Sequence, residues 1–162
     1  MTITVLLVDD EPLARAGLRA ILDAQPDIVV VGEAGDGAAV VPLLRRLQPT
    51  VIAMDVRMPL MDGIDATRLV LRTVPSPPKI LIVTTFENDE YVYRALRAGA
   101  NGFLLKRARP AEIANAVRTV PKGIRSSIPL LSGHSRRATA TRPRANNSIV
   151  RRSPNGSRPF CG

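Results

Sequence analysis

The chain has 162 residues, 45% of them hydrophobic and only 3% aromatic, which suits one domain plus an appendage with a core of Val, Leu, Ile and Ala. A single Cys excludes an internal disulfide, and no apolar run approaches the ~20 residues needed to cross a bilayer. The apolar run at residues 3–8 has no basic residue before it and ends in acids, which excludes a signal peptide. We therefore expect a cytoplasmic protein that does not enter the membrane.

Short apolar, β-branched runs alternate with segments of helical spacing through the first 118 residues. Pro12 suits a first helical turn, and Gly99 suits the position just beyond a helix. This alternation predicts an α/β domain whose parallel sheet is covered by helices on both faces. Periodicity leaves the strand order open between a flavodoxin-like 2-1-3-4-5 order and a Rossmann half. The predicted strands are 3–8, 28–33, 50–54, 79–84 and 101–105, and the predicted helices are 12–24, 38–47, 64–73, 89–98 and 110–119.

The net charge of +9 is confined to the end of the chain. All 14 acidic residues lie within residues 1–118, where 14 basic residues balance them, so the excess falls on residues 119–162. That segment is rich in Arg, Ser and Pro and has no lasting apolar stripe, so it cannot bury enough apolar surface to offset the entropy of ordering. We predict a folded domain at 1–119 and a basic, largely disordered tail at 120–162.

Charged side chains follow three of the predicted strands. Asp9 and Asp10 follow the first strand, Asp55 follows the third and Lys106 follows the fifth. Ligands of open α/β sheets bind at the carboxyl ends of strands, so these groups meet if the first and third strands are central neighbours.

Carboxylates in one pocket repel, by roughly 4 kcal/mol for a pair ~4 Å apart at an effective dielectric near 20. A hard divalent cation such as Mg²⁺ would offset this, and Lys106 would supply a fixed positive charge. Such a site suits phosphoryl transfer, with Asp55 as nucleophile. Taken singly, the acid pair also fits a helix N-terminus, Asp55 a turn and Lys106 a solvated lysine.

Five sequence blocks resemble the signature blocks of response-regulator receiver domains, most closely those of the LuxR/NarL type. The resemblance covers residues 3–118 and implies the flavodoxin-like (βα)5 three-layer sandwich with strand order 2-1-3-4-5. The blocks are Val8–Glu11, Met54–Pro59, Asp62–Gly63, Val83–Phe86 and Gly102–Lys106.

The resemblance also implies roles for matching positions. Asp55 would accept a phosphoryl group from a histidine kinase, and Asp9, Asp10, Asp55 and the backbone carbonyl of Arg57 would hold Mg²⁺. Lys106 would bind a phosphoryl oxygen.

Two further positions would respond to phosphorylation. The hydroxyl of Thr84 would move to the phosphate, and Phe103 would follow as an aromatic switch. Strand alternation sends only one of Thr84 and Thr85 toward the site, and we favour Thr84. Phe103 also fits a core role. The surface formed by the fourth helix, fifth strand and fifth helix would then change its partners or dimerise. The chain would be no enzyme beyond its own phosphorylation and dephosphorylation.

A LuxR-type regulator continues into a helix-turn-helix domain, and residues 119–162 contain no such pattern. We hypothesise that the reading frame shifts near residues 120–122. The alternative is a DNA-binding transcriptional regulator that uses the basic tail, although binding through such a tail would be weak and nonspecific. A flavodoxin-like nucleotide or flavin enzyme is disfavoured, because Asp9-Asp10-Glu11-Pro12 stands where a glycine-rich phosphate loop would follow the first strand. His134 and Cys161 are assigned no function.

Overall fold

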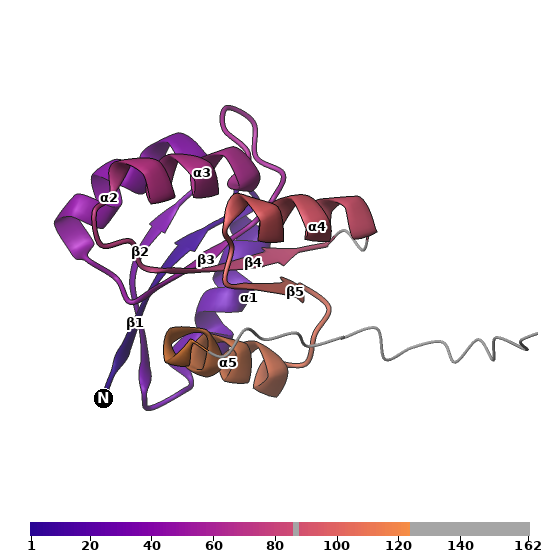
Figure 1. The fold of residues 1–162 in the computed structure, drawn as a ribbon. Coiled ribbons are helices and arrows are strands. Elements are labelled where there is room, and N and C mark those ends of the chain that lie inside the picture. The colour runs from indigo at the N-terminus through magenta and orange to yellow at the C-terminus, as the bar shows by residue number, and fades with distance from the viewer. Residues whose placement is uncertain (86–87, 124–162) are drawn as a thin grey trace, which may run out of the picture. The chain divides into compact units, whose positions relative to one another are not determined.

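The computed structural model describes residues 1–85 and 88–123, in which strands and helices alternate along the chain (Figure 1). The predicted tail, its frameshift, His134 and Cys161 lie outside the described residues, apart from the first part of the tail at 120–123. The strands are β1 (Ile3–Val8), β2 (Ile28–Ala34), β3 (Val51–Met54), β4 (Lys79–Thr84) and β5 (Gly102–Leu105). The helices are α1 (Pro12–Asp23), α2 (Val40–Leu47), α3 (Gly63–Thr73), α4 (Asp89–Ala98) and α5 (Pro110–Thr119).

The five strands form one parallel sheet in the order β2-β1-β3-β4-β5. This confirms the flavodoxin-like order and excludes the Rossmann half. Because β1 lies between β2 and β3, the segments that follow β1 and β3 emerge beside each other. The register of the central pair aligns Val8 with Met54, so the residues that follow them come out at the same level of the sheet.

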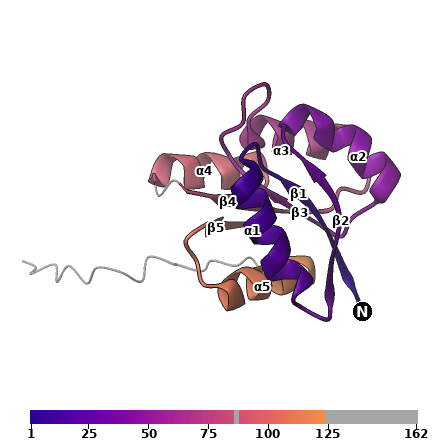
Figure 2. The same ribbon diagram turned by 180° about the vertical axis from the view of Figure 1, so that it is seen from behind.

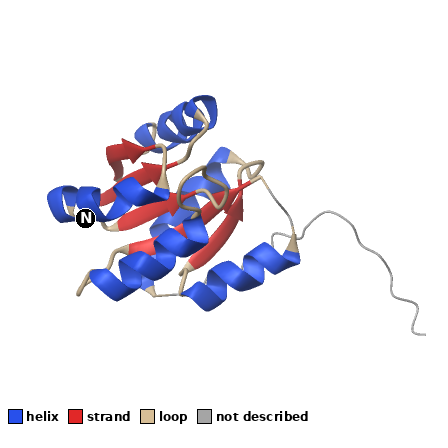
Figure 3. Ribbon diagram, turned by 90° about the horizontal axis from the view of Figure 1, so that it is seen from above, coloured by secondary structure: helices blue, strands red, loops and turns tan. Residues whose placement is uncertain are grey.

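Helices cover both faces of the sheet, as Figures 1 and 2 show from opposite sides and Figure 3 from above. Helices α1 and α5 enclose one hydrophobic core, and α2, α3 and α4 enclose the other. The central strands are buried on both sides, so neighbouring residues such as Leu6 and Leu7 contribute to opposite cores. This explains why the strands are continuous apolar runs rather than alternating ones.

Backbone hydrogen bonds carry the sheet pattern one residue past the strand ends. The N–H of Asp9 donates to Ala34, that of Asp55 to Val8 and that of Lys106 to Thr84, at 2.9, 2.8 and 2.8 Å. Each of these charged residues is thereby fixed at the carboxyl edge of the sheet.

Two helix starts differ from the predicted ones for reasons of local hydrogen bonding. The predicted helix at 38–47 begins as a 3-10 turn, Gly37–Ala39, before α2, because Asp36 accepts a hydrogen bond from the N–H of Ala38. Helix α3 begins one residue early, because Asp62 caps it by accepting from the N–H of Asp65 at 2.8 Å. Capping side chains thus set these starts, whereas apolar periodicity sets only the helix interiors.

The end of α5 is tied to the turn before β2. The guanidinium of Arg118 donates to both carboxylate oxygens of Asp27 at 2.7 Å and to Gln25 at 2.8 Å. These hydrogen bonds lower the pKa of Asp27. The 3-10 turn after α5, Val120–Lys122, buries Val120 in the core beneath α1 and α5.

No helix in residues 1–85 and 88–123 combines the length and apolar character needed to cross a bilayer.

Candidate functional site

Asp55 stands at the end of β3, in the middle of the sheet, with only 6% of its surface exposed. One carboxylate oxygen, Oδ1, accepts a hydrogen bond from the N–H of Val56 at 2.7 Å. The other, Oδ2, accepts from Nζ of Lys106 at 3.1 Å. The carboxylate is therefore buried and held by a charged partner, yet it lies at the edge where a ligand can approach.

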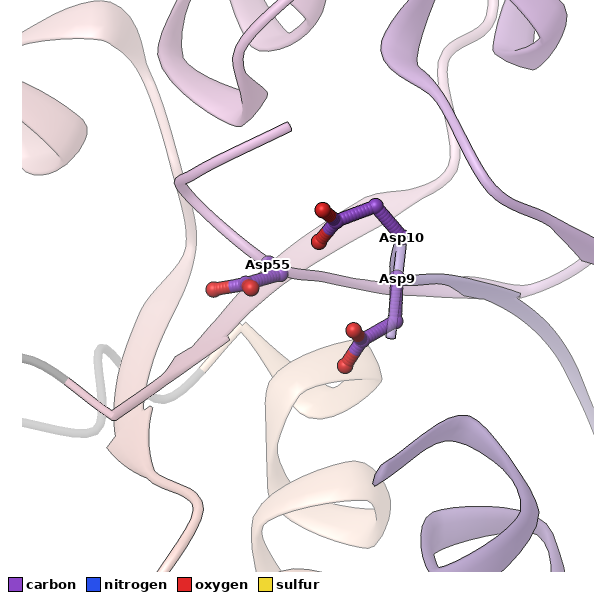
Figure 4. A group of neighbouring side chains, drawn as sticks. All are labelled: Asp9, Asp10 and Asp55. Atoms are coloured by element: carbon purple, nitrogen blue, oxygen red, sulfur yellow. The ribbon is translucent and has the colours of Figure 1, made fainter. Parts of the chain in front are cut away.

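Asp9 and Asp10 follow β1 and lie beside Asp55, as predicted (Figure 4). One carboxylate oxygen from each of the three lies within 4.8 Å of the others. Asp9 is buried, while Asp10 is exposed. Three converging carboxylates supply the oxygen ligands that Mg²⁺ prefers, so this group of residues fits a hard divalent cation.

Lys106 joins the cluster from the end of β5. Its ammonium lies 2.6 Å from Oδ2 of Asp9 and 3.1 Å from Oδ2 of Asp55, and its side chain is 11% exposed. The contact with Asp9 is an ion pair without the angles of a hydrogen bond, so Oδ2 of Asp9 is left with acceptor capacity in a buried position. The predicted meeting of all four charged residues is confirmed.

Opposing effects act on the charge of Lys106. Burial favours the neutral amine, but the close contact with Asp9 and the charge of Asp55 outweigh it, so the pKa of Lys106 is raised. The ammonium therefore stays charged at neutral pH. It offsets part of the repulsion among the carboxylates before any metal binds.

Thr84 ends β4 and is fully buried, whereas Thr85 is exposed. Thr84 is preferred over Thr85 as the residue directed toward the site, and this role stays a prediction. The hydroxyl of Thr84 has no hydrogen-bond partner among the described residues, although the backbone of Thr84 bonds to Lys106 beside the site. Phe103 is partly buried against the α2–α3–α4 core, and its switch role stays a prediction.

We predict that Thr84→Val raises the free energy of unfolding by about 1 kcal/mol, because it removes a buried hydroxyl that has no hydrogen bond to lose. Thr67 is the matched control: it is equally buried, but its hydroxyl donates to the carbonyl of Gly63 at 2.7 Å, so Thr67→Val should destabilise by about the same amount. Urea unfolding without divalent cations measures both. A loss of stability in Thr84→Val would show that its hydroxyl is hydrogen-bonded.

Two residues near the site were not predicted from the sequence. Arg15 in α1 donates to the backbone carbonyl of Asp9 at 2.5 Å. Asp36, after β2, accepts from the N–H of Leu60 at 2.9 Å and so ties down the loop between β3 and α3. This loop contains Arg57, whose side chain is exposed. The first contact joins residues six positions apart and the second joins residues 24 positions apart, and apolar periodicity carries no signal for either.

Comparison with known proteins agrees with this fold and site. Residues 5–118 match the family described as the response regulator receiver domain. The chain is 50% identical over 121 residues to the transcriptional regulatory protein LiaR of Bacillus subtilis, covering 75% of this chain and 57% of LiaR. It is 42% identical over 123 residues to the response regulator VraR of Staphylococcus aureus, covering 76% of this chain and 58% of VraR.

The fold is also similar to that of a solved receiver-domain structure. The signal receiver domain of the response regulator NarL from Mycobacterium tuberculosis has 39% identity and a TM-score of 0.71, covering 75% of this chain and 98% of that domain. The chain belongs to the response regulator receiver domain family, with LuxR/NarL-type relatives, and is thus a signalling protein of two-component systems rather than a classical enzyme. It spans little more than half the length of LiaR and VraR.

Proposed function

We propose that the domain accepts a phosphoryl group on Asp55 from the phosphohistidine of a histidine kinase. The observation that carries this is the placement of Asp55: a buried carboxylate paired with Lys106 and close to two further carboxylates. In the reaction, a carboxylate oxygen of Asp55 forms a bond to phosphorus while the bond from phosphorus to the histidine nitrogen breaks. The nitrogen leaves with the bonding electron pair from a phosphohistidine that is protonated on its other ring nitrogen, so the histidine ends in its neutral form.

The proposed metal ligands are Asp9, Asp10, Asp55 and the backbone carbonyl of Arg57, and Mg²⁺ bound there would neutralise charge on the phosphoryl oxygens. Asp9 fits because its Oδ2 is buried and retains acceptor capacity. Lys106 is already within reach of Asp55, so it would donate to a phosphoryl oxygen attached there. The chain thereby catalyses its own phosphorylation, and water attacking the same phosphorus would break its bond to the Asp55 oxygen, restore the free carboxylate and release inorganic phosphate.

We further propose that the hydroxyl of Thr84 donates to the phosphoryl group and that Phe103 moves in consequence. The support is the buried and unpartnered hydroxyl at the end of β4, one strand away from Phe103 in β5. A change there would alter the surface formed by α4, β5 and α5 and with it the preference for a partner or a second copy of the chain.

The test is the mass of the intact protein after incubation with acetyl phosphate and Mg²⁺. The wild type should gain about 80 Da, the mass of one phosphoryl group, and Asp55→Asn should gain none. Asp65→Asn is the matched control, since Asp65 is an exposed residue of α3 whose carboxylate pairs with Arg68. Equal labelling of Asp55→Asn and wild type would refute the proposal.

Transcriptional regulation is a second proposal for the whole protein. It is favoured by the similarity of the chain to LiaR, a transcriptional regulatory protein. A footprint on DNA that disappears on deletion of residues 119–162 would support regulation through the basic tail, and a full chain that protects no DNA site would contradict it.

A further inference from the structure

Arg15, in the first turns of α1, bridges two strands at the edge where the site lies. Its Nε donates to Oε2 of Glu33 in β2 at 2.8 Å. Its Nη1 donates to the backbone carbonyl of Asp9 at 2.5 Å. The planar guanidinium presents these donors in a fixed geometry, so a single side chain holds the end of β1 against β2.

The carbonyl that Arg15 holds belongs to the peptide between Asp9 and Asp10. On the other side of Asp9, its N–H donates to Ala34 at 2.9 Å. The peptides before and after Asp9 are therefore both fixed by hydrogen bonds. The Asp9 side chain is oriented as well, because its Oδ1 accepts from the N–H of Glu11 at 2.9 Å.

The orientation of the Asp10 side chain depends on this backbone more than the orientations of Asp9 and Asp55 do. It is exposed, and its carboxylate makes no hydrogen bond or ion pair within the described part of the chain. The direction in which it projects is set by the peptide plane that Arg15 holds. Asp55, by contrast, is oriented through hydrogen bonds to its own carboxylate.

The other end of the bridge is itself anchored. Glu33 also pairs with Arg19, which pairs in turn with Asp23 at 3.1 Å. These hydrogen bonds, first from Arg19 and then from Arg15, lower the pKa of Glu33, so it is ionised at neutral pH. Arg19 makes no contact with Asp9 and is therefore a natural control for Arg15.

We propose that Arg15 is a positioning residue for divalent-cation binding: anchored on Glu33, it holds the peptide between Asp9 and Asp10 in the orientation that the metal-ligand carboxylates require. This inference rests on the metal site of the proposed function and adds to it a residue that would touch neither metal nor phosphate. Residues that orient metal ligands from outside the ligand shell commonly affect metal affinity by 10–100-fold.

The sign of the effect separates positioning from charge. Arg15 is a cation bonded to the backbone of Asp9, one of the proposed metal ligands, so by charge alone its removal would strengthen the binding of Mg²⁺. By loss of positioning, its removal weakens binding. We expect positioning to dominate, with Arg15→Ala binding Mg²⁺ about tenfold more weakly than wild type.

The experiment is calorimetric titration of the full chain with Mg²⁺. Arg15→Lys keeps the charge but replaces the donors on two separate nitrogens, Nε and Nη1, with a single nitrogen, so its affinity for Mg²⁺ should also fall at least severalfold. Arg19→Ala removes a cation from the same Glu33 and should bind within about twofold of wild type, since it does not touch the peptide. Unfolding in EDTA confirms that the variants are folded.

A second readout needs no metal. In the NMR spectrum of the backbone amides of the metal-free protein, the amide resonance of Asp10 should shift in Arg15→Ala and Arg15→Lys and should stay in place in Arg19→Ala. Wild-type or tighter Mg²⁺ binding by Arg15→Ala, or full affinity in Arg15→Lys, would overturn the inference. If the wild type does not bind Mg²⁺, or if Asp10→Asn binds it as well as the wild type, the proposed metal site fails instead. The amide shift alone then decides whether Arg15 orients the peptide between Asp9 and Asp10.

Discussion

Replacing Gly63 with alanine is expected to lower the free energy of unfolding by about 3 kcal/mol, the upper end of the usual cost of forcing a methyl group into a packed region. A Cβ at Gly63 would lie 2.0 Å from the backbone carbonyl oxygen of Asp55 and 3.2 Å from Cα of Val56. Both are backbone atoms, so no side chain can rotate to make room. The N–H of Gly63 also donates to Val56 at 2.8 Å, which holds the two segments together.

Gly17→Ala provides a control with the opposite sign. Gly17 lies in the exposed interior of α1, and no atom lies within 4 Å of a Cβ built there. Alanine has the higher helix propensity, so this change should raise the free energy of unfolding by about 0.5–1 kcal/mol. Urea unfolding of both variants, without divalent cations, measures the difference.

Because the methyl group at residue 63 pushes against Asp55 itself, its effect should reach the chemistry. Gly63→Ala that is still folded at low temperature should label with acetyl phosphate more slowly than wild type, whereas folded Gly17→Ala should label normally. Wild-type stability and labelling in Gly63→Ala would mean that the loop after β3 is not packed on Asp55 as described.

The sequence predicted the charged residues of the site better than the hydrogen bonds that hold them in place. Asp9, Asp55 and Lys106 could be located because each directly follows a continuous apolar run, and a parallel sheet gathers the residues that follow such runs at one edge. That reasoning depends on the strand order, which periodicity leaves open, since pairing joins segments far apart in sequence. The order came from the resemblance and is confirmed by the sheet.

Contacts between loops carry no periodic signal and escaped prediction. Arg15 stands on the partly buried side of α1, and nothing in its spacing indicates that it reaches the carbonyl of Asp9. Asp36 is of a residue type that suits turns, but its hydrogen bond to Leu60 depends on how two loops meet. By contrast, the preference for Thr84 over Thr85 as the residue directed toward the site used the alternation of side chains along a strand, a local property, and it stays a prediction.

Lys106→Met should lower the free energy of unfolding by about 3 kcal/mol in EDTA, because it leaves the buried carboxylates of Asp9 and Asp55 without their cation. Mg²⁺ should remove most of this deficit. The variant offers carboxylate oxygens that no ammonium occupies, so it should bind the cation more tightly than wild type and gain more stability from it. Lys79→Met, at the opposite end of β4, should change stability by less than about 0.5 kcal/mol with or without Mg²⁺.

The same variant separates metal binding from phosphoryl transfer. If Lys106 stabilises the phosphoryl oxygens, Lys106→Met should be labelled by acetyl phosphate on the order of 100-fold more slowly, the usual cost of losing one fixed electrostatic donor. Tighter Mg²⁺ binding together with slower labelling excludes metal loss as the cause. Wild-type labelling would contradict a role for Lys106 in the transfer, and wild-type stability in EDTA would contradict its role in balancing the carboxylates. Both readouts depend on the same ammonium, within 3.1 Å of Asp55. Stability in EDTA tests its role before the reaction, and the rate of labelling tests its role during phosphoryl transfer.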